Sequence, residues 1–125
     1  MALEGYRGRF IMLYFWATWC PFCTREMPST IETIHREFRD QGLVVLAINL
    51  GEPRAVVAPW VEQRHLTFPI LLDEGGAVAG AYRVRGTPTV VLVDRQGRLW
   101  AARWDLGSGT PRAIPLLAAL LAARP

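Results

Sequence analysis

The sequence predicts an α/β fold in which a central mixed β-sheet is flanked by helices on both faces. Apolar, β-branched runs alternate with helical patterns in the order βαβαβαββα, and this order is typical of such a sheet. The chain has 125 residues, of which 51% are hydrophobic, so it can bury a core of its own. No repeat or linker divides it, and we expect residues 1–125 to form a single domain.

The first half of the chain predicts two buried strands joined by a long helix. Residues 10–16 are apolar, β-branched or aromatic throughout, as in a strand covered on both faces of a sheet. From residue 23 to residue 41 apolar side chains recur at helical spacing, Pro28 predicts a kink, and Gly42 stands just past the helix end. Residues 43–50 are again apolar almost throughout and predict the second strand.

Shorter elements follow these strands. Pro53 suits the first turn of a helix that extends to about His65, and a strand is expected at about residues 68–72. Residues 74–82 predict a short helix that is weakened by three glycines.

The last part of the chain predicts a hairpin and a closing helix. A turn over residues 84–88 leads into a strand over residues 89–93. The Asp-Arg-Gln-Gly sequence at residues 94–97 predicts a tight turn into a final strand over residues 99–103. Thr110 followed by proline is a typical N-cap, and it opens an expected terminal helix.

The composition excludes several functions. Fourteen basic and eleven acidic residues give a net charge of +3, but the basic residues form no tight run, which argues against nucleic-acid binding. All fourteen are arginines, so lysine-based catalysis is excluded. The apolar runs at residues 10–17 and 113–123 are shorter than the roughly 20 residues of a membrane-spanning helix. Residues 1–9 lack the apolar core of a secretory signal.

Two cysteines, Cys20 and Cys23, stand where the first predicted strand gives way to a helix. Three residues apart on a helical turn, two α-carbons lie about 5–6 Å apart, which is within the range of a disulfide. Cys20 is expected at the helix N-terminus and open to solvent, where unpaired N–H groups lower the pKa of a thiol and favour the attacking thiolate. Cys23, one turn inside, suits a shielded resolving thiol. The spacing therefore predicts a redox pair.

A CxxC pair is also half of a zinc site, and it can be a purely structural disulfide. The sequence contains no second cysteine pair, and His35 and His65 lie far apart on predicted helix surfaces. We therefore predict no metal site.

The sequence WCPFC after FWAT, together with Gly-Thr-Pro-Thr at residues 86–89, resembles the thioredoxin superfamily and within it the thiol-disulfide oxidoreductases of TlpA and ResA type. The resemblance covers nearly the whole chain. It implies a thioredoxin fold with an extra βα insertion, the strand and helix between Gly51 and Asp73, which precedes a cis-proline loop at Pro88. It also implies that the protein needs no bound cofactor.

The resemblance further implies which residues bind the substrate. Pro88 is expected to follow a cis peptide bond in a loop that faces the cysteines, and Thr87 is expected to offer its backbone to an extended substrate segment. Trp16 and Trp19 are expected to belong to the rim of the active site, and the substrate is expected to contact Trp19, Pro21 and Phe22.

The chain departs from classical thioredoxins at Tyr14, where those proteins carry a buried aspartate six residues before the first cysteine. Glu26, three residues after Cys23, matches the acidic residue of ResA-like active sites. A half-buried carboxylate beside two thiols has a raised pKa because of desolvation, and it can shuttle their proton. The alternative is an exposed glutamate on the helix surface.

We therefore expect a protein thiol-disulfide oxidoreductase, acting as a reductase through mixed disulfides. Its expected partners are a disulfide-bearing protein substrate and a thiol electron donor such as a membrane thiol carrier, and it is expected to be a monomer. The resemblance implies an extracytoplasmic reductase of apocytochrome c or another secreted disulfide, with its anchor absent from this chain. A true start at Met1 would instead place it in the cytoplasm.

Three alternatives differ in their chemistry. Thr18 just before Cys20 suggests a thiol peroxidase of the peroxiredoxin type, although that family uses a lone peroxidatic cysteine with proline and threonine upstream. Cys-Pro-Phe-Cys suggests a glutaredoxin-like use of glutathione, which Trp19 and the inserted unit disfavour. A non-catalytic interaction module could use the cis-proline groove, but the presence of both cysteines argues against it.

Overall fold

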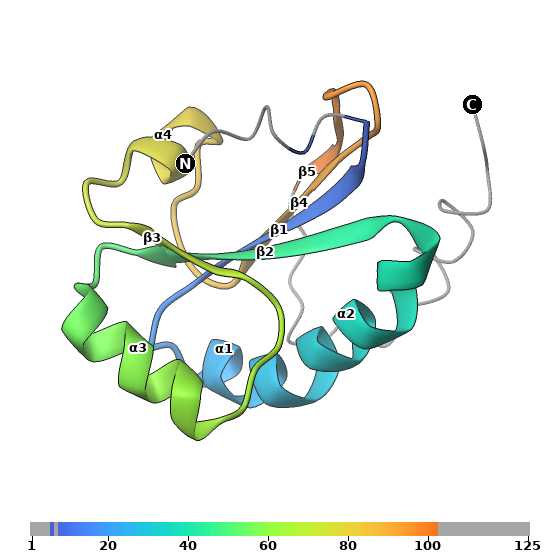
Figure 1. Cartoon of the computed structure of the whole chain (residues 1–125). Helices are drawn as coiled ribbons and strands as arrows, with labels where there is room; N and C mark the ends of the chain where they lie inside the picture. Colours follow the sequence, from blue (N-terminus) through green and yellow to red (C-terminus); the bar gives the residue numbers. More distant parts are fainter. Residues whose placement is uncertain (1–5, 7, 103–125) are drawn as a thin grey trace.

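The computed structural model describes Tyr6 and residues 8–102, with only the backbone for residues 99–102. In this part of the chain five strands form one sheet in the order β3-β2-β1-β4-β5 (Figure 1). The strands are β1 (Phe10–Trp16), β2 (Leu43–Leu50), β3 (Ile70–Asp73), β4 (Thr89–Val93) and β5 (Leu99–Ala102). β2 is parallel to β1 and β3, whereas β4 is antiparallel to β1 and β5. The predicted mixed sheet is therefore confirmed.

The long helical segment after β1 changes its type at Pro28. It begins as α1 (Pro21–Glu26), continues as a π-helix (Met27–Ile31) and as α2 (Glu32–Phe38), and ends in a 3-10 turn (Arg39–Gln41). Proline has no N–H and its ring clashes with the carbonyl four residues earlier, and the wider π turn is the irregularity found at this proline. At Pro28, where the sequence predicts a kink, the structure has a π segment.

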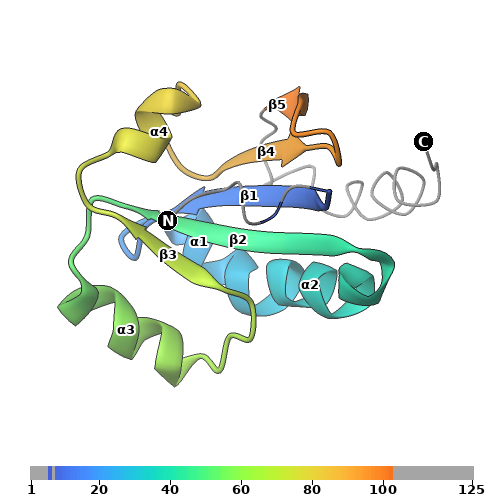
Figure 2. The ribbon, with the colours of Figure 1, turned by 45° about the horizontal axis from the view of Figure 1, so that its top comes forward.

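Helices cover both faces of the sheet, as predicted (Figure 2). Alternate residues of β1 point to opposite faces, so Tyr14 and Trp16 share a buried cluster with side chains of α1, α2 and α3 (Arg54–Gln63). Leu13 and Phe15 lie in a second cluster with α4 (Ala77–Ala81). All seven residues of β1 are buried, and this explains why the run is apolar throughout.

The observed bounds of two helices differ from the predicted ones where the backbone turns left-handed, and the strand expected at about residues 68–72 is found at Ile70–Asp73. The helix expected to reach His65 ends at Gln63, and His65 has a positive φ of 53°. The helix expected from residue 74 begins only at Ala77, after Gly76 with φ 75°. The expected helix at Thr110 lies outside the described residues. Within the described residues, no helix has the length and apolar character needed to cross a membrane.

Candidate active site

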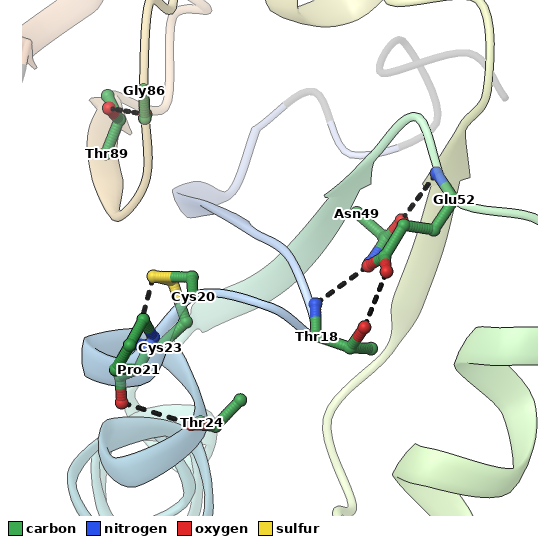
Figure 3. Close-up of a disulfide and its surroundings, with 9 residues drawn as sticks. All are labelled: Thr18, Cys20, Pro21, Cys23, Thr24, Asn49, Glu52, Gly86 and Thr89. Carbon is green, nitrogen blue, oxygen red and sulfur yellow. Dashed lines mark hydrogen bonds between the residues drawn. A yellow bond between two sulfur atoms is a disulfide. The ribbon is translucent and has the colours of Figure 1, made fainter.

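The two cysteines form a disulfide across the first turn of α1 (Figure 3). Their α-carbons lie 5.3 Å apart, as the spacing predicts. Cys20 is the N-cap residue of α1, and its sulfur accepts a hydrogen bond from the backbone N–H of Cys23 at 3.3 Å. Cys23 has no exposed surface, whereas Cys20 keeps 3%. The positions on the helix agree with the prediction, but Cys20 in the disulfide is much less open to solvent than expected.

Exposed apolar side chains lie next to the two cysteines, whereas Trp16, which the resemblance also placed in the rim, is fully buried and does not belong to it. Trp19, directly before Cys20, is 68% exposed, and Phe22, between the cysteines, is 50% exposed. Pro21 is exposed at the first position of α1. The guanidinium of Arg25 lies over the Phe22 ring, 5.1 Å from its centroid. This surface can contact apolar side chains of a partner next to the sulfurs.

The loop before β4 reaches the same end of the sheet. β1 pairs with β4 as far as Phe15 opposite Thr89, so the residues just before Thr89 lie beside the end of β1, from which the chain runs to Cys20. The Thr87–Pro88 peptide bond is cis, as the resemblance implies, and both residues are half-buried. Thr89 donates a hydrogen bond to the carbonyl oxygen of Gly86 at 2.6 Å, which tightens this loop (Figure 3).

Glu26 lies at the last position of α1 and is half-buried, so the alternative of an exposed surface glutamate is wrong. Burial, and after it the charge of Glu26, raise the pKa of Tyr14 well above its usual value. Glu26 therefore lies within electrostatic reach of the Tyr14 phenol, in the part of the core that also holds Cys23. The hydroxyl of Tyr14 is buried and has no hydrogen-bond partner among the described residues.

The sequence did not predict a hydrogen-bonded network beside Cys20, formed by Thr18, Asn49 and Glu52 (Figure 3). The Glu52 carboxylate accepts from the Thr18 N–H at 2.7 Å, from the Thr18 hydroxyl at 2.5 Å and from the Asn49 amide at 2.8 Å. Asn49 in turn accepts from the Glu52 N–H at 3.1 Å. Burial opposes the charge of Glu52, but these hydrogen bonds outweigh it and hold the pKa of the carboxyl below its usual value.

One signal in the sequence points to this network. Asn49 is the only asparagine of the chain and the only polar residue of the apolar run that forms β2, and its side chain is fully buried. A buried amide needs hydrogen-bond partners, and Glu52 follows it by three residues.

The two histidines and a groove beside α3 are the remaining candidate sites, and they contain fewer reactive groups than the cysteine pair. His35 is half-buried, and burial lowers its pKa, while His65 is exposed. No group of three metal-ligating side chains occurs among the residues that the structure describes. A groove of about 400 Å³ between α3 and β3 is lined mainly by apolar side chains together with Arg54 and Glu62, and it contains none of the predicted site residues.

Known proteins resemble this chain in sequence. The model of the AhpC/TSA family matches residues 1–102. The thiol-disulfide oxidoreductase ResA of Geobacillus kaustophilus is 42% identical over 97 residues, which are 78% of this chain and 55% of that protein. ResA of Halalkalibacterium halodurans is 38% identical over 97 residues, 78% of this chain and 54% of that protein. The chain thus spans about half the length of these relatives.

Solved structures resemble it in fold. A putative thiol:disulfide interchange protein DsbE from Chlorobium tepidum superposes with a TM-score of 0.82 at 27% identity, over 94% of this chain and 84% of that one. StoA from Bacillus subtilis superposes with a TM-score of 0.70 at 27% identity, over 78% of this chain and 74% of that one. The thioredoxin-like fold and the resemblance to ResA-type oxidoreductases are therefore confirmed.

Proposed function

The chain belongs to the AhpC/TSA family, and from this premise we propose that it is a protein thiol-disulfide oxidoreductase that acts as a reductase. One observation carries the proposal. The Cys20–Cys23 disulfide spans the first turn of a helix, and the exposed Trp19 and Phe22 lie beside it. A structural disulfide needs no such apolar surface around it, whereas an exchange with protein partners does.

The proposed reaction transfers two electrons and two protons. The Cys20 thiolate attacks one sulfur of a partner's disulfide, and the other partner sulfur leaves as a thiolate that takes up a proton. Cys23 then gives up its proton and attacks the Cys20 sulfur of the mixed disulfide. The second partner sulfur leaves and takes up a proton, and the protein is left with the Cys20–Cys23 disulfide that the structure contains.

We assign the remaining predicted site residues to two roles. Glu26, one turn after Cys23 and half-buried, suits the group that accepts the proton of Cys23. An extended partner segment would contact the rim residues and the loop before β4, where the backbone of Thr87 beside the cis-proline Pro88 would bind it. The full set assigned to partner binding is Trp19, Pro21, Phe22, Thr87 and Pro88.

The partners and the insertion are part of the same proposal. We infer a disulfide-bearing protein as substrate and a second thiol protein or membrane thiol carrier that reduces Cys20–Cys23 again. We also infer that the unit between Gly51 and Asp73, which contains α3 and β3, is an insertion relative to classical thioredoxins. The protein would work as a single-domain monomer.

Insulin reduction tests the activity. With dithiothreitol as electron donor, the wild-type protein should accelerate insulin precipitation, and Cys20→Ser should abolish the acceleration. In the absence of dithiothreitol, reduced Cys23→Ser should accumulate mixed disulfides with insulin, and dithiothreitol added afterwards should release them. Consumption of hydrogen peroxide without insulin reduction would instead support the thiol peroxidase, and neither activity would support the interaction module.

The redox potential tests the direction of electron flow. Pro21 and Phe22 supply no positive charge between the two sulfurs, and the start of α1 is the feature that favours a Cys20 thiolate. Equilibration with glutathione should give a potential below about −200 mV, on the reducing side. A potential above about −150 mV would show that the protein is an oxidant.

A further inference from the structure

The carboxylate of Glu52 holds the loop that leads to Cys20. Both of its oxygens are engaged, one by the Thr18 N–H and the Asn49 amide, the other by the Thr18 hydroxyl. Thr18 and Glu52 lie 34 residues apart, so this contact ties the loop after β1 to the loop after β2. A carboxylate with partners on both oxygens is fixed in position, and it fixes Thr18 with it.

A second contact fixes the chain just before this loop. The ring of Trp16 packs on the ring of Trp60 from α3, with 4.9 Å between their centroids. Trp16 is fully buried, whereas Trp19 three residues later is 68% exposed. Between these two tryptophans the chain makes a turn that contains Thr18, closed by a hydrogen bond from the Cys20 N–H to the Ala17 carbonyl oxygen at 3.2 Å. The two hydrogen bonds from Thr18 to Glu52 set how the chain enters α1 and presents Cys20.

The network also brings a negative charge near Cys20. The hydrogen bonds keep Glu52 ionised at neutral pH, although burial opposes its charge. Its oxygens touch a residue two positions before Cys20, and consecutive α-carbons are about 3.8 Å apart, so the carboxylate lies on the order of 10 Å from the sulfur. At that distance in partly buried surroundings a charge changes a thiol's ionisation measurably, at low salt above all.

We propose that Glu52 is a positioning residue of the redox site, which holds the Cys20 loop through Thr18 and whose negative charge restrains formation of the Cys20 thiolate. The inference rests on the proposed function, because Cys20 matters only if it is the attacking sulfur. It assigns a redox role to a residue of the proposed insertion, far from the CxxC sequence. A weakly ionised Cys20 is also what a reducing couple requires.

Other ionisable groups surround the cysteine pair, and the experiment has to hold them constant. Tyr14 lies on β1 in the buried cluster that contains both cysteines, Glu26 and the exposed Arg25 lie on α1, and the exposed Arg85 lies in the loop before Pro88. None of them is changed by a substitution at Glu52. The difference between wild type and variant therefore isolates the contribution of Glu52.

The decisive variant is Glu52→Gln, which keeps the shape of the side chain and removes its charge. The reduced protein is treated with iodoacetamide at a series of pH values and at low ionic strength, and the rate profile gives the pKa of Cys20. We expect this pKa to fall by a few tenths of a unit, with an unchanged rate at high pH. A Cys20 pKa equal to that of the wild type would overturn the proposal.

The chain offers a matched control in Glu32. Its carboxylate also accepts from the N–H and the hydroxyl of one threonine, Thr67, but it does so at the start of α2, away from the cysteines. Glu32→Gln should leave the pKa of Cys20 unchanged. An equal fall in both variants would show a general effect of lost stability and would equally overturn the proposal.

Thr18→Val separates position from charge and decides the matter if Glu52→Gln does not fold. It keeps the carboxylate and removes one of the bonds that hold the loop. We expect an unchanged pKa of Cys20 and a KM for insulin raised about two- to threefold, which corresponds to one weakened hydrogen bond. A KM like that of the wild type would contradict the positioning role. Failure of the proposed function is distinguishable, because the wild type itself would then not reduce insulin.

Discussion

The first turn of α1 gives its two sulfurs different surroundings. Cys20 is the N-cap residue, and the N–H of Cys23 that now points at its sulfur would stabilise a Cys20 thiolate in the reduced protein. Cys23 has no exposed surface. We predict that partial alkylation of the reduced protein labels Cys20 before Cys23, as measured by mass spectrometry of the peptides. Preferential labelling of Cys23 would contradict the assignment of the nucleophile.

The hydroxyl of Tyr14 is buried without a partner among the described residues. A buried hydroxyl without a partner costs free energy in the folded state, and its removal breaks no hydrogen bond. We predict that Tyr14→Phe leaves the free energy of unfolding of the oxidised protein unchanged or raises it by up to about 1 kcal/mol, measured by urea denaturation. A loss of more than about 1 kcal/mol would show that the hydroxyl has a partner.

Tyr82→Phe tests whether a tyrosine on the other face of the sheet affects the redox site. Tyr82 lies on the opposite face of the sheet, where its ring contacts Phe15 with 6.2 Å between centroids. Its substitution should leave the redox potential unchanged, because no cysteine belongs to that cluster.

At the scale of elements, Glu32 joins α2 to the segment before β3. Its carboxylate accepts from the Thr67 N–H at 2.9 Å, from the Thr67 hydroxyl, and from Arg36 at 2.6 Å. Burial would raise the pKa of Glu32, but these hydrogen bonds hold it below its ordinary value of 4.5. The network therefore stabilises the fold fully at pH values above the pKa that Glu32 has in the unfolded chain. This stability is lost as the pH falls through the lower pKa that Glu32 has in the native protein.

We predict that Glu32→Gln lowers the free energy of unfolding at pH 7 by about 1–3 kcal/mol. The difference from the wild type should shrink as the pH falls below 4.5, the ordinary value, because the carboxyl of the unfolded wild type binds a proton there before the native one does; it should vanish below the lower native pKa, where the native carboxyl is also uncharged. Urea denaturation of both proteins at a series of pH values measures this. A difference that stays constant down to complete protonation would rule out the carboxylate as its source.

The sequence predicts the central elements well and the distant contacts poorly. The bounds of β1 and β2 agree with the prediction because these runs are buried on both faces and are therefore apolar at nearly every position. The disulfide geometry follows from a spacing of three residues. The role of Glu52 could not be predicted, because it depends on a contact with Thr18 across 34 residues, which no local pattern records.

At the scale of the whole molecule, the disulfide closes a very short loop. Cys20 and Cys23 are three residues apart, so the bond removes little conformational entropy from the unfolded chain. This loss raises the free energy of the unfolded state by only about 2 kcal/mol. The buried cluster around them is built mainly from other side chains of the sheet and helices. We predict that the reduced protein stays folded and loses no more than about 2 kcal/mol of stability, measured by denaturation with and without dithiothreitol. Unfolding upon reduction would make the disulfide structural.

The position of β1 at the centre of the sheet makes the stability of the site depend on the stability of the whole sheet. β1 lies between β2 and β4, and every one of its residues is buried, so its amide protons can exchange with deuterium oxide only when the whole sheet opens. The loop to Cys20 leaves directly from this strand. The site is thus anchored to a strand whose amides should exchange slowly, and heat should abolish the reduction of insulin at the same temperature at which the β1 amides lose their protection.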